Sequence, residues 1–146
     1  MEITSAVFES DSMIPKKYTC DGQNINPPLG ISDVPAEARS LALIMHDSDA
    51  PVSGGWTHWI IFNMDPSLAR IAENDVPEPG VQGLNSSGSF GYRGPCPPNG
   101  THHYEFRLYA LDTELSLGGQ AAKNDLEQAM KGHILQQAIL VGLYER

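Results

Sequence analysis

Four apolar segments, separated by turn-forming residues, constrain the fold of this chain more than any other feature. They cover residues 40–46, 58–64, 102–111 and 133–144. Their lengths and the glycine, proline, asparagine and aspartate residues around them are typical of β-strands. The first two are nearly continuous apolar runs, as expected of strands buried on both faces, whereas the third alternates apolar and polar residues. These patterns predict a mainly β, antiparallel β-sandwich-like domain.

Helix signals are few. Asn124 is a candidate N-cap for a short helix, with Glu127 at the capping-box position and Gly132 at the C-terminal stop. Asp65 is a second candidate N-cap, followed by Pro66 as the first helical residue, for a helix of only one or two turns. We therefore expect one or two short helices at the periphery of the domain.

Composition and charge exclude several classes of function. The formal net charge is −9, and lysine and arginine form no cluster. Nucleic-acid binding needs a basic face, and an anionic membrane surface would repel such a chain. No apolar run reaches the length of a membrane span, and the start of the chain has no signal-peptide pattern. We therefore expect a cytoplasmic protein with no stable membrane insertion, folded as a single domain over residues 1–146.

The two cysteines, Cys20 and Cys96, lie in loops rich in proline and glycine. A reducing cytoplasm favours two free thiols, which is the first expectation. The alternative stays open that the two residues lie close together in the fold and bridge when oxidised.

The longest irregular segment is 75–101, which holds six of the 14 glycines and five of the 11 prolines. A connection of this length in a compact domain is usually functional or disordered. Phe90, Tyr92 and Cys96 argue against disorder. The segment is therefore predicted to be a packed loop that approaches a site.

Strand parity separates the two adjacent histidines, because successive side chains on a strand point to opposite faces. His102 shares its face with Tyr104 and further apolar residues, whereas His103 shares its face with Glu105 and Arg107. His102 is therefore predicted to point inward and His103 to face solvent.

The same argument places two further polar residues at strand ends. Asp47 shares parity with the apolar residues of 41–45, and His58 shares parity with Ile60 and Phe62. A buried polar group without a partner costs about 1–3 kcal/mol. Asp47, His58 and His102 are therefore predicted to line one shared pocket. The alternative is that each is a core residue with a separate partner.

Three motifs, "HDSDAP" at 46–51, "GGWTHW" at 54–59 and "GYRGPCPPNGTHHY" at 91–104, resemble the signatures of the phosphatidylethanolamine-binding proteins. That family includes the Raf kinase inhibitor proteins and the flowering regulators. The N-terminal "IPKKYTCDGQNINPPLGI" resembles its bacterial and archaeal branch. The resemblance implies an anion-binding pocket, whose sides would be formed by Asp47, Asp49, Pro51, His58, Cys96, Pro97, Pro98, His102 and Tyr104.

The function that we expect from these residues is non-catalytic binding of a small phosphate-bearing or other anionic ligand, without a cofactor. The two imidazoles, the Tyr104 phenol and loop N–H groups would supply the donors. Asp47 would orient a pocket histidine or meet the ammonium of a zwitterion such as phosphorylethanolamine, and Asp49 would brace its own turn. The resemblance also permits modulation of a kinase or another phosphorylated protein partner, and a homodimer is a further expectation.

The alternative function is that of a metal-dependent hydrolase with Asp47, Asp49, His58 and His102 as ligands. Imidazole and carboxylate groups suit zinc or iron. No His-Glu-x-x-His or Cys-x-x-Cys motif supports it, however. A reactive Cys96 thiolate near His102 is a weaker alternative.

Overall fold

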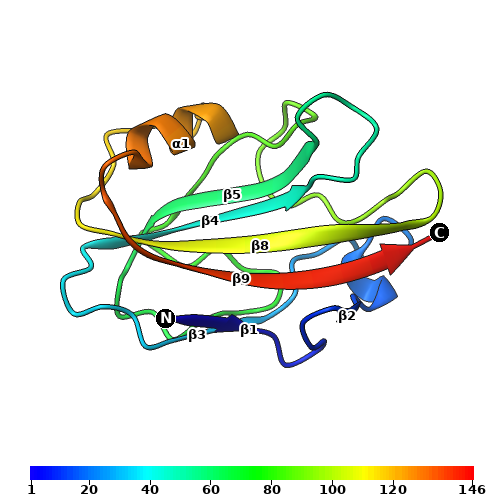
Figure 1. Ribbon diagram of the computed structural model, residues 1–146, viewed down its shortest axis with the longest axis horizontal. Coiled ribbons are helices and arrows are strands. Elements are labelled where there is room, and N and C mark those ends of the chain that lie inside the picture. Colours follow the sequence, from blue (N-terminus) through cyan, green and yellow to red (C-terminus); the bar gives the residue numbers. More distant parts are fainter.

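The computed structural model describes residues 1–146, which form two β-sheets and one α-helix (Figure 1). The six-stranded main sheet has the order β2-β9-β8-β4-β5-β7, and the three-stranded sheet has the order β1-β3-β6. The strands of the main sheet are β2 (Ser12–Met13), β4 (Ser40–Asp47), β5 (Trp56–Met64), β7 (Val81–Gln82), β8 (Thr101–Leu111) and β9 (Ile134–Glu145). Those of the small sheet are β1 (Glu2–Thr4), β3 (Leu29–Ser32) and β6 (Arg70–Ile71). All pairs are antiparallel except β2 with β9, so the mainly β fold class is confirmed.

Two apolar clusters cover the two faces of the main sheet, which explains why every residue of β4 is buried. Leu41, Leu43 and Met45 face the small sheet and belong to the larger cluster between the sheets. Ala42 and Ile44 point to the other face, where they pack in a cluster that includes side chains of the helix. Figure 1 shows the helix and the small sheet on opposite sides of the main sheet.

The parity predicted for β8 is confirmed. His102 and Tyr104 are buried on the face that continues into the larger cluster, whereas His103 is exposed. Because β4 and β8 run antiparallel with Asp47 opposite Tyr104, the end of β4 meets the beginning of β8. The strand order thus gathers the predicted polar residues at one end of the sheet.

The helix α1 (Lys123–Met130) confirms one of the two predicted helices, but it begins earlier than expected. Its N-cap is Ala122, whose N–H donates to the carboxylate of Asp125 at 2.9 Å, so Asn124 lies inside the first turn. Leu126 and Met130 are buried against the outer face of the main sheet.

The second predicted helix, at Asp65, is wrong. The Asp65 carboxylate accepts hydrogen bonds from the N–H and the hydroxyl of Ser67, at 2.8 and 2.7 Å, which closes a turn. Such a local side-chain bond competes with helix formation, and the chain continues into β6. The chain has one short 3-10 helix, η1 (Lys16–Tyr18), which lies between β2 and β3.

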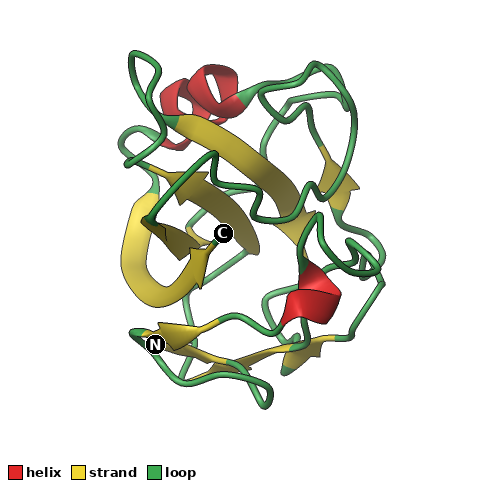
Figure 2. Cartoon of the chain, turned by 90° about the vertical axis from the view of Figure 1, so that its right-hand side faces the viewer, coloured by secondary structure: helices red, strands yellow, loops and turns green.

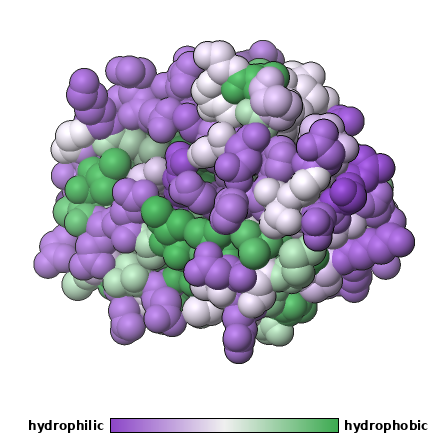
Figure 3. All heavy atoms as spheres, turned by 45° about the vertical axis from the view of Figure 1, so that its right-hand side comes forward, coloured by the Kyte–Doolittle hydropathy of each residue, from purple (hydrophilic) through white to green (hydrophobic).

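The segment 75–101 packs against the sheet, as predicted. It contributes β7, and the hydroxyl of Tyr92 donates to the carbonyl of Tyr18 at 2.7 Å. Phe90 differs from the expectation, because 59% of its surface is exposed. Hydrophilic residues cover most of the surface in Figure 3, with apolar residues gathered in a band across that face. No helix of the chain has both the length and the apolar character that a membrane crossing requires.

Candidate ligand pocket

A cavity of about 400 Å³ lies at the end of the main sheet where β4 ends and where β5 and β8 begin. Figure 2 views the molecule from this side, where loops surround the strand ends. Of the predicted residues, the structure brings the following together around the cavity: Asp47, Pro51, His58, Cys96, Pro97, Pro98, His102 and Tyr104. Asp49 is not among the lining residues.

Asp47 and His102 form a buried pair at the cavity. Oδ2 of Asp47 accepts a hydrogen bond from Nδ1 of His102 at 2.6 Å, and the two side chains are only 4% and 10% exposed. Oδ1 of Asp47 accepts the N–H of Asp49 at 2.8 Å. Because Nδ1 of His102 donates to the carboxylate, the ring is held with its other nitrogen free. Asp47 therefore orients His102, as expected, and it also braces the turn.

Asp49 has a different place from the one expected. Its carboxylate accepts hydrogen bonds from the N–H and from ring Nδ1 of His103, both at 2.8 Å, outside the cavity. These bonds, the backbone one first, lower the pKa of Asp49 below its usual value. The carboxylate of Asp49 thus ties the turn after β4 to the solvent-facing side of β8, and Asp49 braces its own turn only through its N–H, which donates to Asp47.

His58 reaches the cavity through a β-bulge. Met45 pairs with Trp59 and His46 pairs with Thr57, so His58 has no partner across the strand pair. Bulges of this kind re-aim a side chain and are frequent beside functional sites. Ile60 and Phe62, which share parity with His58, lie in the cluster on the helix side of the sheet. The predicted pocket position of His58 is therefore found, but simple parity would have placed it on the opposite face.

The His58 ring is fixed by a main-chain acceptor. Nδ1 lies 2.6 Å from the carbonyl oxygen of Arg93, and the ring meets Trp56 and Tyr104 edge-on, with centroids 4.6 and 5.2 Å apart. Burial is the main reason that the pKa of His58 falls to about 4. At neutral pH His58 is therefore an uncharged imidazole whose one N–H already faces the Arg93 carbonyl. This result differs from the expectation that both pocket imidazoles donate hydrogen bonds to the ligand.

Tyr104 contributes a polar group without a partner. The residue is fully buried, and its hydroxyl forms no hydrogen bond within the protein. Burial raises the pKa of this phenol, so the hydroxyl keeps its proton. Buried polar groups are nearly always satisfied, so this hydroxyl without a partner, on a residue that lines the cavity, is an exception that needs an explanation.

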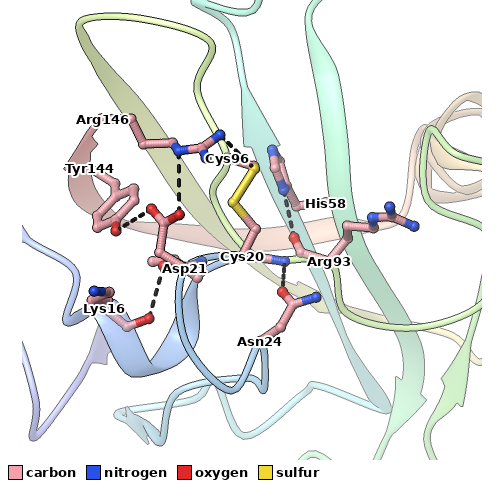
Figure 4. The surroundings of a disulfide bond; sticks show 11 residues. Lys16, Cys20, Asp21, Asn24, His58, Arg93, Cys96, Tyr144 and Arg146 are labelled. Carbon is pink, nitrogen blue, oxygen red and sulfur yellow. Dashed lines mark hydrogen bonds and ion pairs between the residues drawn. A yellow bond between two sulfur atoms is a disulfide. The ribbon is translucent and has the colours of Figure 1, made fainter.

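One wall of the cavity is held by a disulfide bond between Cys20 and Cys96 (Figure 4). This corrects the expectation of two thiols and removes Cys96 as a candidate nucleophile. The bond joins the loop after η1 to the proline-rich loop before β8. The Arg146 guanidinium donates to Sγ of Cys96 at 3.3 Å and pairs with Asp21 at 3.4 Å, so the C-terminal residue covers the outside of this wall.

Several lining residues were not among the predicted site residues. Trp56 lies opposite Asp47 in the strand pair, and its ring forms a side of the cavity. Arg93 is exposed and forms no ion pair. The side-chain carbonyl oxygen of Asn24 accepts a hydrogen bond from the N–H of Gly94 at 2.7 Å. Arg93 and Asn24 occur in stretches of the family-like motifs, but neither shows a parity or periodicity signal that would single it out.

The four residues of the hydrolase alternative are not arranged as metal ligands. Asp47 and His102 bond each other, His58 uses Nδ1 on a carbonyl, and Asp49 bonds the exposed His103. No group of three or more histidine, cysteine, aspartate or glutamate side chains in the chain is placed to hold a metal ion. Nothing in the structure supports the alternative.

The structure thus defines a mainly β, two-sheet fold with a cavity at one end of the main sheet. A sequence profile of the phosphatidylethanolamine-binding proteins matches residues 4–145, and the chain belongs to this family.

Relatives and solved structures agree with this assignment. The chain is 53% identical to a UPF0098 protein of Methanothermobacter thermautotrophicus, over 100% of this chain and 99% of the relative. The structure of a phosphatidylethanolamine-binding protein homologue, CT736 of Chlamydia trachomatis, superposes with a TM-score of 0.95 at 47% identity, covering 99% of this chain and 97% of that one. Escherichia coli YbcL, described as a member of the mammalian family, gives 0.94 at 27% identity, with 99% and 98% covered.

Proposed function

We propose that the cavity binds a small phosphate-bearing ligand and that it does so without catalysing a reaction. The observation that carries this proposal is the hydroxyl of Tyr104, a protonated donor without a partner on a residue that lines the cavity beside two imidazoles. Arg93, which is exposed and forms no ion pair, also belongs to the lining, with its carbonyl bonded to His58. An oxyanion that enters the cavity would give the orphaned hydroxyl a partner.

The absence of a prepared nucleophile is the reason for proposing binding. Cys96 is bonded to Cys20, and the carboxylate of Asp47 is engaged by His102 and by the turn. A hydroxyl or thiol nucleophile is activated by a base within hydrogen-bond reach, and the cavity holds no such free thiol. The arrangement of donors matches recognition of a fixed group better than it matches group transfer.

Replacement of Tyr104 by phenylalanine tests the proposal, because stability and binding should change in opposite directions. The hydroxyl has no partner in the free protein, so Tyr104→Phe should leave the free energy of unfolding unchanged or raise it by up to about 1 kcal/mol. Affinity for ethyl phosphate should fall roughly tenfold to a hundredfold, the value of a hydrogen bond to a charged group.

The measurements are urea unfolding and isothermal titration calorimetry with ethyl phosphate. Tyr109→Phe is a matched control, because that residue is buried in the cluster on the helix side and does not line the cavity. If the wild type and Tyr104→Phe bind ethyl phosphate with equal affinity, the Tyr104 hydroxyl does not contact the ligand. The absence of binding heat with ethyl phosphate at millimolar concentration would reject phosphate binding itself.

A further inference from the structure

The tautomer of His58 is set by the atom that it contacts. A carbonyl oxygen can only accept a hydrogen bond, so Nδ1 of His58, 2.6 Å from the carbonyl of Arg93, must carry the proton. In an uncharged imidazole the other nitrogen, Nε2, is then a bare lone pair. The low pKa of about 4, caused mainly by burial, agrees with this neutral state.

Nε2 of His58 is available to a ligand. No protein group bonds it, and among the partnerless side-chain polar atoms only the Tyr104 hydroxyl is fully shielded from solvent. His58 itself lines the cavity. Figure 4 shows the ring with Nδ1 directed to Arg93 and the opposite nitrogen pointing away from it.

A second acceptor lies close by. The carboxylate of Asp47 has about four lone-pair positions, and two of them receive His102 Nδ1–H and the N–H of Asp49. The cavity therefore presents two acceptors, Nε2 of His58 and the carboxylate of Asp47. A fully ionised oxyanion has only lone pairs to offer, so it would place an acceptor against His58 and leave both unsatisfied.

We propose that the pocket selects an oxyanion that still carries a proton, namely a singly ionised phosphomonoester whose P–O–H donates to Nε2 of His58. This inference rests on the proposed binding of a phosphate-bearing ligand and names the form of that ligand. His58 is then the residue that sets specificity. Sulfate and phosphodiesters carry no such proton near neutral pH, so the pocket discriminates against them.

The pH dependence follows from the ligand. The second pKa of a phosphomonoester is about 6, so the singly ionised fraction falls about tenfold per pH unit above it. Affinity for ethyl phosphate should therefore decline by about that factor between pH 7 and pH 8. The charged and titratable groups that face His58 are Asp47 and His46 on β4, His102 and Tyr104 on β8, and Arg93 on the loop. Any titration of these groups would act on sulfate as well, so the ratio of the two affinities isolates the proton on the ligand.

The experiment is calorimetric titration of the whole chain with ethyl phosphate, dimethyl phosphate and sulfate at pH 6, 7 and 8. We expect ethyl phosphate to bind at least tenfold more tightly than the other two at pH 6, with the preference shrinking as pH rises. Equal binding of all three would overturn the proton requirement and leave the proposed function standing. Binding of none would reject the proposed function.

The role of His58 is tested by His58→Asn, whose side-chain amide can still donate to the Arg93 carbonyl but which lacks the second ring nitrogen. This variant should lose the preference for ethyl phosphate over sulfate, and His103→Ala, on the exposed side, should keep it. A preference retained in His58→Asn would show that another group takes the proton.

Should the variant fold poorly, ¹⁵N NMR of the wild-type histidine rings gives an independent answer. The proposal requires Nε2 of His58 to be unprotonated in the free protein and hydrogen-bonded in the ethyl phosphate complex. A proton on Nε2 in the free protein at pH 7 would overturn it.

A zwitterionic ligand provides one more arm, because an ammonium could donate to the same acceptors. Glycerophosphoethanolamine has an ammonium but no proton on its phosphodiester. It should bind no better than dimethyl phosphate if the P–O–H is the required donor. If glycerophosphoethanolamine binds as tightly as ethyl phosphate, an ammonium group and not a P–O–H donates to these acceptors, and the proposal is overturned.

Discussion

Two aspartate–histidine pairs join the end of β4 and the turn after it to the beginning of β8, and one pair is buried while the other is exposed. Asp47 and His102 pair at 2.6 Å with side chains 4% and 10% exposed, whereas Asp49 and His103 pair at 2.8 Å with side chains 45% and 59% exposed. The two pairs have the same residue types and nearly the same distance between the ring nitrogen and the carboxylate oxygen. What differs is the face of β8 from which each histidine projects. Burial, and not the motif, therefore decides which pair belongs to the pocket.

The largest difference is expected when one partner of each pair is removed. His102→Ala would leave the Asp47 carboxylate buried with only the N–H of Asp49, and breaking a buried pair in this way costs about 3–5 kcal/mol. We therefore expect a large loss in the free energy of unfolding, measured in urea, and loss of ethyl phosphate binding. A loss below about 1 kcal/mol would mean that burial does not distinguish the two pairs.

A third histidine sharpens the comparison, because His58 is buried without a carboxylate partner. The pKa of His58 is about 4 in the folded protein, against 6.5 for a free imidazole. The unfolded chain therefore binds more protons between these values, and stability that is complete above pH 6.5 is lost as the pH falls towards 4. The difference corresponds to about 3 kcal/mol.

Urea unfolding of the wild type and of His58→Asn between pH 4 and pH 7 measures this contribution. The variant lacks the titrating ring, so its stability should depend less steeply on pH. His46, whose pKa burial also lowers, acts in the same direction in both proteins. As a control, His133→Gln removes an exposed histidine and should leave the slope unchanged. Parallel curves for wild type and His58→Asn would show that His58 is not a buried neutral base.

The smallest effect is expected for the exposed pair. His103→Ala should lower the free energy of unfolding by less than about 1 kcal/mol, because exposed ion pairs contribute little. Its affinity for ethyl phosphate should equal that of the wild type. Calorimetry and urea unfolding check both points, and a loss of affinity like that of His102→Ala would extend the pocket to the outer face of β8.

Parity in single strands was sufficient to place Asp47, His102 and Tyr104 at one pocket, whereas Pro51 and the Cys96–Pro98 loop were expected only from the family resemblance. The alternation in β8 separates His102 from His103, and the uninterrupted apolar character of β4 predicts its burial on both faces. These features depend on local sequence alone, because side-chain direction in a strand has a period of two.

The features that sequence reasoning missed depend on contacts between distant segments. The bulge at His58 arises from the register of β5 against β4, which no single strand encodes. The disulfide requires the loop after η1 to meet the loop before β8, 76 residues further along the chain. The turn at Asp65 was missed for a local reason, since its carboxylate bonds Ser67 in place of capping a helix.

The most direct test of the central claim, that burial selects the pocket histidines, is an NMR titration of the five histidine rings with ethyl phosphate. We expect the resonances of His58 and His102 to shift together, while those of His46, His103 and His133 stay in place. His46 bonds Thr57 and Gly54 away from the cavity, so it serves as a buried control. A shift of His103 as large as that of His102, or no shift of either buried pocket ring, would contradict the account.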